Sequence, residues 1–215
     1  MNPIWFNAVR ASGGAVAVPW WRAGGAPEPV AVYEPAAAAN LADSYIPTIA
    51  TVGNTTLDPA IVGGVAPTFD AGWDSEGTGQ LRTGIVPDAN YSLLVRFRGA
   101  TNLGGVVGML GGETTQLRVG IAIAGILYGN GAVQVVAPVV ANGVFCIAGG
   151  RAYRNGTDEG VSLGSYTGTG IELYILTVNG QVARSNAIVE YMAIWDTNIG
   201  HETWVPAVSA AVAAL

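Results

Sequence analysis

Short runs of hydrophobic residues recur along the chain from Val30 onwards, and residues typical of turns separate them. In the second half of residues 91–98 apolar and polar side chains alternate, as in a strand with one buried face. Similar runs predict strands at residues 30–33, 65–69, 80–83, 106–110, 116–123, 126–128, 132–137, 143–148, 152–154, 171–178 and 187–195. Strands this short and this regularly spaced indicate an all-β sandwich or barrel, of which we expect the antiparallel two-sheet sandwich.

Turn residues support this interpretation. Asn-Gly pairs begin at residues 130, 142, 155 and 179. Asn-Gly favours the type I′ hairpin turn, because both central residues need a positive φ. Residues 53–67 predict a loop, and the alanine-rich residues 36–42 predict one or two helical turns.

The two ends of the chain differ from this pattern. Residues 1–29 contain several aromatic residues among Gly and Pro, with no sustained period, and predict an extended N-terminal arm. Residues 30–215 then form a single domain. Pro206 suits the first position of a helix, so the alanine-rich residues 207–215 predict a short C-terminal helix.

Composition agrees with one large hydrophobic core. Half of the 215 residues are hydrophobic and 11% are charged, which is the opposite of a disordered chain. The 31 glycines follow no Gly-X-Y repeat and suit turns and bulges. Residues 119–150 carry no charge, but turn residues interrupt them repeatedly, so strands explain them better than a membrane helix.

The charge balance restricts the partners. The formal net charge is -6, which argues against a nucleic-acid partner, and all basic residues are arginine. The first ten residues lack the basic and apolar regions of a secretory signal, so we expect none. The lone Cys146 lies in an apolar run and is expected to be a small buried hydrophobe.

An enzyme-like motif is present but lies in the wrong context. Residues 160–164 match G-x-S-x-G around Ser162, and Asp196 and His201 follow in the order found in α/β-hydrolases. That motif requires a strand before the serine and a helix after it, whereas Ser162 lies in a segment rich in Gly, Ser and Thr. We therefore expect no catalytic residues, and we interpret His201 as a capping or surface side chain.

Two other groups of residues are candidates for binding. Asp70, Asp74 and Glu76 offer oxygen ligands that suit Ca²⁺, although a solvated turn explains them better and no metal site is predicted. Aromatic side chains near turns can stack on sugars, which makes candidates of Trp73, Tyr128, Tyr153 and Tyr166. Aromatic residues are also enriched at interfaces, which makes partner contacts of Trp5, Phe6, Trp20 and Trp21.

Several segments, in order, resemble the concanavalin A-like lectin/glucanase family, which includes laminin-G-like domains. They are residues 30–33 with 41–44 at the start, 91–97 in the middle, 152–156 at an aromatic-x-Asn-Gly hairpin, and 188–196 at the last strand. The resemblance covers residues 30–215 and implies a jelly-roll of two antiparallel sheets. The Glu-x-Asp-x-x-Glu strand of the family's glucanases is absent from this sequence.

The resemblance is strongest to single-domain members among tailed-phage structural proteins. It implies a non-enzymatic virion protein, for example a capsid decoration protein or an appendage component. Such a protein would be assembled in the host cytoplasm, contact capsid or other virion proteins through residues 1–29, and form a homo-oligomer. The alternative is a carbohydrate-binding adhesion domain that recognises surface glycans, and a glycan hydrolase is the third hypothesis.

Overall fold

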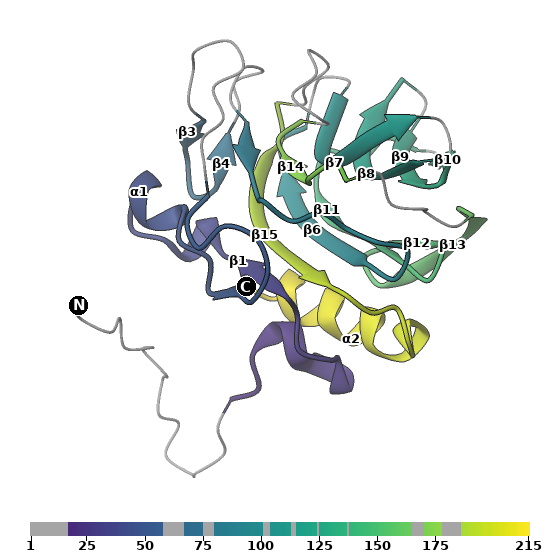
Figure 1. The fold of residues 1–215 in the computed structure, drawn as a ribbon, viewed down its shortest axis with the longest axis horizontal. Coiled ribbons are helices and arrows are strands. Elements are labelled where there is room, and N and C mark those ends of the chain that lie inside the picture. Colours follow the sequence, from purple (N-terminus) through teal and green to yellow (C-terminus); the bar gives the residue numbers. More distant parts are fainter. Residues whose placement is uncertain are drawn as a thin grey trace.

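The computed structural model describes residues 17–57, 67–74, 80–100, 104–112, 115–123, 125–136, 138–164, 170–177 and 186–215. Within them the protein is an all-β sandwich of two antiparallel sheets with a C-terminal helix, as the sequence predicts (Figure 1). Its helical elements are η1 (Trp20–Gly25), η2 (Pro35–Ala37), α1 (Leu41–Ser44) and α2 (His201–Ala213). No helix of the described residues has the length and hydropathy of a membrane span.

Sheet A is the larger of the two sheets. It contains β1 (Ala31–Tyr33), β2 (Ile49–Ala50), β3 (Thr68–Phe69), β4 (Trp73–Asp74), β6 (Ser92–Arg98), β11 (Gly143–Ala148), β12 (Arg151–Arg154), β13 (Thr157–Ser162) and β15 (Ile188–Trp195). The strand order is β13-β12-β11-β6-β15-β1-β2, and β4, paired with β3, also joins β15. The long strands β6 and β15 therefore lie side by side in the middle of this sheet.

Sheet B packs against one face of sheet A. It contains β5 (Leu81–Arg82), β7 (Gly104–Gly112), β8 (Thr115–Ala122), β9 (Gly125–Asn130), β10 (Ala132–Val136) and β14 (Tyr174–Ile175), in the order β10-β9-β8-β7-β14-β5. Between the sheets lies the main core, which includes Leu93, Phe97 and Phe145 from sheet A and Val119 and Tyr128 from sheet B. The rings of Phe97 and Phe145 stack with their centroids 4.5 Å apart.

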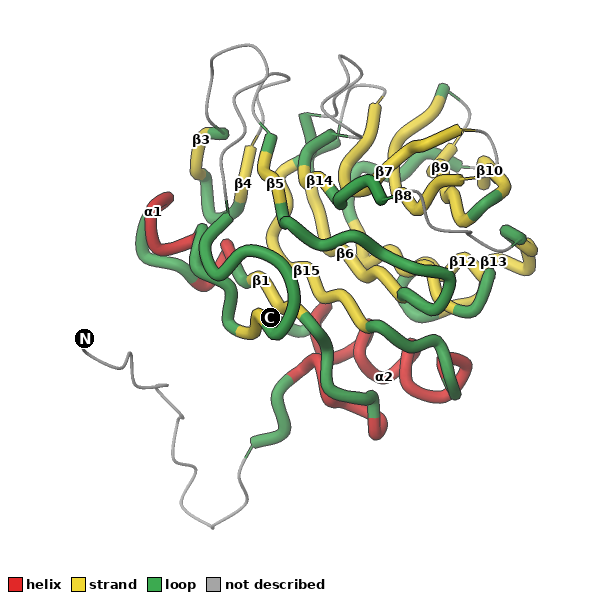
Figure 2. The backbone as a smooth tube through the Cα atoms, in the orientation of Figure 1, coloured by secondary structure: helices red, strands yellow, loops and turns green. Residues whose placement is uncertain are grey.

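A second core lies on the other face of sheet A. The helix α2 and the short helix η1 cover this face, and Figure 2 shows α2 beside sheet A on the side away from β7–β10. Trp195 of β15 packs against Trp204 of α2 with ring centroids 4.8 Å apart. Cys146 is fully buried in the same cluster, as the sequence predicts, and this burial raises the pKa of its thiol.

A β-bulge in β15 changes which of its residues face each core. Val189 pairs with Phe97 and Tyr191 pairs with Arg96, so Glu190 is the extra residue between them. Val189 belongs to the main core and Tyr191 to the second core. The bulge therefore resets the alternation of side chains along β15.

The N-terminal segment differs from the predicted extended arm. Trp20 and Trp21 lie in the 3-10 helix η1 and are only 7% and 6% exposed, because both pack into the second core. The Trp20 indole also donates a hydrogen bond to Glu34 at 2.9 Å. Gly24 has φ +65, and a Cβ there would meet Ala207 of α2 at 2.5 Å, so η1 and α2 approach too closely for a side chain. Packed structure thus begins before the predicted boundary at residue 30.

The C-terminal helix begins five residues earlier than predicted. Gly200, with φ +67, precedes its first residue, His201, and Pro206 lies inside the helix. Proline leaves the carbonyl of the residue four positions earlier without its donor. That residue is Glu202, and both Glu202 and Pro206 are exposed, so water can bind the free carbonyl. Burial of Trp204 and Val205 favours the longer helix.

The Asn-Gly pairs have different outcomes. At residues 155–156 both φ angles are positive, and the pair joins β12 to β13 as a type I′ turn would. At Asn130–Gly131 only the glycine has a positive φ, in the connection between β9 and β10. Asn142–Gly143 is not a hairpin, because β10 and β11 belong to different sheets, and the pair beginning at residue 179 lies outside the described residues.

Truncation of Trp204 should destabilise the fold strongly. We expect Trp204→Ala to lower the free energy of unfolding by about 3–5 kcal/mol, because it removes a buried ring of the second core that packs on Trp195 of sheet A. Chemical denaturation followed by tryptophan fluorescence or circular dichroism measures the loss. The exposed Leu215→Ala is the control and should change stability by about 0.5 kcal/mol or less. A loss for Trp204→Ala as small as that of the control would contradict the second core.

Candidate functional site

The outer face of sheet B is the sheet surface that no described helix covers (Figure 1). The outer face of sheet A, in contrast, is occupied by α2 and η1. On β10, Val133 and Val135 project from sheet B and are 36% and 43% exposed.

One row of cross-strand neighbours runs across sheet B and takes one residue from each of its six described strands. Its members are Arg82 of β5, Tyr174 of β14, Gly108 of β7, Arg118 of β8, Gly129 of β9 and Val133 of β10. The adjacent residues Leu81, Ile175, Val107, Leu117 and Tyr128 all lie in the main core. Because side chains alternate along a strand, the row faces outward.

Two glycines in this row lie against Arg118. A Cβ on Gly108 would lie 2.3 Å from Cβ of Arg118, and a Cβ on Gly129 would lie 3.1 Å from its Cγ. The stem of Arg118 therefore lies along the sheet, over positions where larger residues would put side chains. This burial lowers the pKa of the Arg118 guanidinium, and its Nε is buried without a hydrogen-bond partner.

The other end of the row is a polar cluster. Nε of Arg82 donates to Oε1 of Glu172 at 2.5 Å, and the amide of Gly84 donates to Oε2 at 2.9 Å. Burial, with a smaller contribution from the Glu172 carboxylate, raises the pKa of the neighbouring Tyr174 phenol. The row thus combines an aromatic ring, two guanidinium groups and apolar side chains on one face.

The aromatic residues predicted to contact carbohydrate do not belong to this surface. Trp73 is fully buried and donates its indole hydrogen to Ser44 at 2.7 Å. Tyr128 is buried between the sheets, and Tyr153 is buried near α2. These three predictions are therefore wrong as stacking surfaces, because the two cores take up the rings. Tyr166 lies outside the described residues.

Of the four residues predicted to contact a partner, two are buried and two lie outside the described residues. Trp20 and Trp21 are buried against α2 and sheet A of their own chain, so they present no surface to another protein. Trp5 and Phe6 lie outside the described residues.

The serine motif does not form the site that its sequence resembles. Ser162 ends strand β13, and the two residues after it are not helical, so the strand-turn-helix elbow is missing. His201 is buried rather than on the surface. Its Nδ1 lies 2.7 Å from the Tyr153 hydroxyl, and its Nε2 lies 3.2 Å from a Glu202 carboxylate oxygen. The described partners of the two ring nitrogens are therefore Tyr153 and Glu202.

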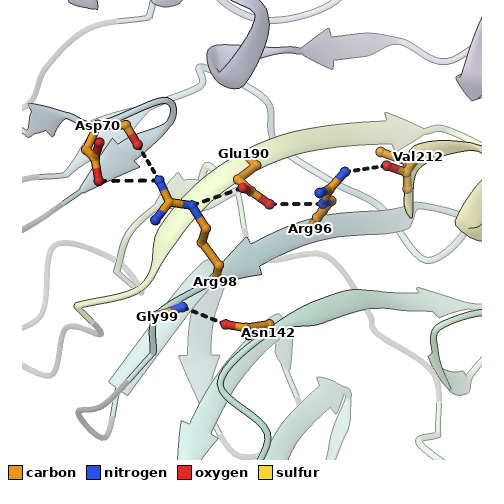
Figure 3. A network of polar contacts seen from close by, with 7 residues as sticks. All are labelled: Asp70, Arg96, Arg98, Gly99, Asn142, Glu190 and Val212. Carbon is orange, nitrogen blue, oxygen red and sulfur yellow. Dashed lines mark hydrogen bonds and ion pairs between the residues drawn. The ribbon is translucent and has the colours of Figure 1, made fainter. Parts of the chain in front are cut away.

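Of the candidate calcium residues, Asp70 takes part in an ion-pair network (Figure 3). Arg98 donates to the Asp70 carbonyl at 2.6 Å and pairs with Glu190 at 3.0 Å. Glu190 also pairs with Arg96 at 2.9 Å, and Arg96 donates to the carbonyl of Val212 near the end of α2.

The network ties β6, the bulge of β15 and α2 together. Glu76 lies outside the described residues. Elsewhere in the described ranges, no three His, Cys, Asp or Glu side chains gather as a metal site would require.

No protein-family model matches the chain, and no curated protein matches it. Several solved structures do. Domain 4 of AbnA, an extracellular arabinanase of Geobacillus stearothermophilus solved with arabinotriose, gives a TM-score of 0.55 at 12% identity, over 85% of this chain and 98% of that one. The shared feature is the fold.

Two larger proteins contain a similar sandwich. The binding domain of botulinum neurotoxin serotype G gives a TM-score of 0.51 at 10% identity, over 85% of this chain and 50% of that one. Trypanosoma rangeli sialidase gives 0.52 at 12% identity, over 85% of this chain and 32% of that one. This chain therefore spans half of the first and about a third of the second.

The buried tyrosines should resist ionisation. Burial raises the pKa of Tyr128, and it raises the pKa of Tyr153 to about 12. An unfolded tyrosine ionises near pH 10, so the protonated phenols stabilise the fold fully below about pH 10. That contribution should be lost as the pH rises from about 10 to about 12. A titration of phenolate absorbance, in parallel with circular dichroism, measures it. Ionisation of all eight tyrosines near pH 10 in a fully native protein would contradict the burial.

Proposed function

We propose that this protein is a non-enzymatic glycan-binding β-sandwich and that the outer face of sheet B holds the sugar. The observation that carries the proposal is the row from Arg82 to Val133, which combines an aromatic ring, cationic donors and exposed apolar groups beside two glycines. The opposite sheet offers no comparable surface, since α2 and η1 occupy it.

The chemistry of this row suits a sugar ring. Sugars present C–H groups on their faces, which pack on aromatic and apolar side chains, and hydroxyl groups at their edges, which need hydrogen-bond partners. Tyr174 and Val133 supply the first kind of contact, and Arg82, Glu172 and Arg118 supply the second. Gly108, between Tyr174 and Arg118 in the row, adds no side chain to this face.

The proposal that binding is not followed by cleavage rests on the carboxylates. Glycoside hydrolysis commonly uses two carboxyl groups on either side of the bond that breaks. Among the described residues next to this row, Glu172 provides the carboxylate. Its two oxygens accept hydrogen bonds from Arg82 and from the amide of Gly84. The fold comparison adds support, because the similar arabinanase domain was solved with arabinotriose and the similar neurotoxin domain is a binding domain.

A glycan array with arabino-oligosaccharides and animal and bacterial surface glycans tests the proposal. We expect the protein to bind a subset of them, and Tyr174→Ala to weaken that binding by about tenfold or more because it removes the ring of the row. The control is Ile199→Ala, which changes an exposed apolar residue outside sheet B. This variant should bind glycans as the wild type does.

Two results would contradict this proposal. One is the absence of binding to every glycan by a protein with a native circular dichroism spectrum. The other is the appearance of new reducing ends when the bound glycans are incubated with the protein, which would show that it cleaves them.

A role in a phage particle remains the second hypothesis, and it rests on the sequence resemblance. It is compatible with the first, because a virion surface protein can also bind host glycans. It predicts that peptides of this chain are found by mass spectrometry in purified particles of a phage that encodes it, in a fixed ratio to the major capsid protein. Gradient-purified particles that lack these peptides would contradict the virion role and leave glycan binding unaffected.

A further inference from the structure

Arg118 differs from the other arginines that the structure describes, because none of the described carboxylates pairs with it. Each of the others pairs with an acid: Arg22 with Glu28, Arg82 with Glu172, Arg96 and Arg98 with Glu190, Arg151 with Asp158, and Arg154 with Glu159. The protein carries a net charge of -6, so acids are more numerous than bases. An arginine left alone in such a chain therefore needs an explanation.

The surroundings of Arg118 make its isolation costly. Its stem lies beside Gly129 on the outer face of sheet B, and its Nε is buried without a hydrogen bond. Burying a charged donor without a partner is unfavourable, and it becomes favourable when an anion completes the site. The guanidinium remains charged at neutral pH, because its ordinary pKa lies far above 7.

We propose that Arg118 binds the carboxylate of an acidic sugar on the outer face of sheet B. This inference rests on the proposed glycan-binding function and specifies its ligand. A guanidinium presents parallel N–H donors that match the two oxygens of a carboxylate, which gives direction as well as attraction. Gly108, the cross-strand neighbour of Arg118 on β7, adds no side chain of its own to the face that the sugar would approach.

The register also places a second contact for the same ligand. Tyr174 and Arg118 are the two cross-strand neighbours of Gly108, on β14 and β8. Two strand spacings separate them by roughly 10 Å, with only a glycine between, which leaves room for a sugar ring. The ring would lie over Gly108, with its carboxylate towards Arg118 and the aromatic side chain at its other edge.

A single carboxylate fits this site better than a polyanion. On the described part of this face, the positive charge without a paired carboxylate is that of Arg118, since Arg82 in the same row is paired with Glu172. A ligand with many negative charges would be repelled by the net charge of the protein. We therefore expect a uronic or nonulosonic acid residue in an otherwise neutral glycan.

Matched pairs of glycans test the inference on the full chain. Each pair differs in one group: glucuronic acid against glucose, and a sialylated glycan against its asialo form. We expect the carboxylate member to bind about tenfold more tightly, as one strong charge-assisted contact would give. Arg118→Gln should reduce this preference to about twofold or less, and Arg118→Lys, which keeps the charge but not the fork, should give an intermediate value.

Two further variants separate binding from folding. Gly129→Ala should also reduce the carboxylate preference, because its Cβ would meet Cγ of Arg118 at 3.1 Å and displace the side chain. Arg151→Gln, on β12 of sheet A, removes the same charge elsewhere and should keep the full preference. Arg118→Gln should not lower the melting temperature, because Arg118 pairs with no carboxylate of the residues that the structure describes.

The outcomes distinguish this inference from the function on which it rests. If neutral and carboxylate members bind equally well to the wild type, or if Arg118→Gln keeps the preference, the role of Arg118 is wrong while glycan binding stands. A preference for sulfated over carboxylated members of added pairs would also overturn it. If no glycan binds the natively folded wild type, the proposed function fails and the ligand fails with it.

Discussion

The packing of α2 and η1 on the outer face of sheet A is the constraint on which the rest of the structure depends. A two-sheet sandwich normally buries one face of each sheet and leaves two faces to solvent. Here one of those faces becomes a second core that includes Trp20, Trp195 and Trp204. Strand β6 therefore buries Leu93 on one side and Leu94 on the other. The surface available for recognition is reduced to sheet B and the loops.

Much of the fold follows from the sequence because it depends on local patterns. Residues 91–98 were predicted as a strand, and β6 occupies Ser92–Arg98, since alternation near Arg96 and Arg98 is a local signal. The sequence pattern does not predict the edge strand β13, because this strand has no such local signal. Most of its side chains are exposed, and Gly160 has φ +72, so no buried face marks it in the sequence. The helix start was misplaced because Pro206 favours a first turn, while burial of Trp204 extends the helix before it.

The candidate site could not be predicted, because it depends on which residues become neighbours across strands. Nothing near Arg118 in the sequence indicates that Gly108 and Gly129 will flank it, since the strand register determines this. The aromatic residues predicted to contact carbohydrate are buried for a related reason. A ring next to a turn is exposed in a simple sandwich, but α2 packs near Tyr153 and the main core takes up Tyr128. Sequence patterns indicate which side chains share one face of a strand, but they do not indicate which other elements pack on that face.

The contact between η1 and α2 joins segments from near opposite ends of the described chain, and this has a consequence for biosynthesis. Gly24 of η1 lies against Ala207 of α2, and beyond the end of η1 the carbonyl of Pro27 accepts a hydrogen bond from the indole of Trp195 in β15, 168 residues away. During translation, residues 20–25 leave the ribosome long before residues 201–213 exist. Trp20 and Trp21 then have no helix to cover them until the last part of the chain is made. Contacts of such high sequence separation form slowly, so these indoles would be natural binding sites for a chaperone on the nascent chain.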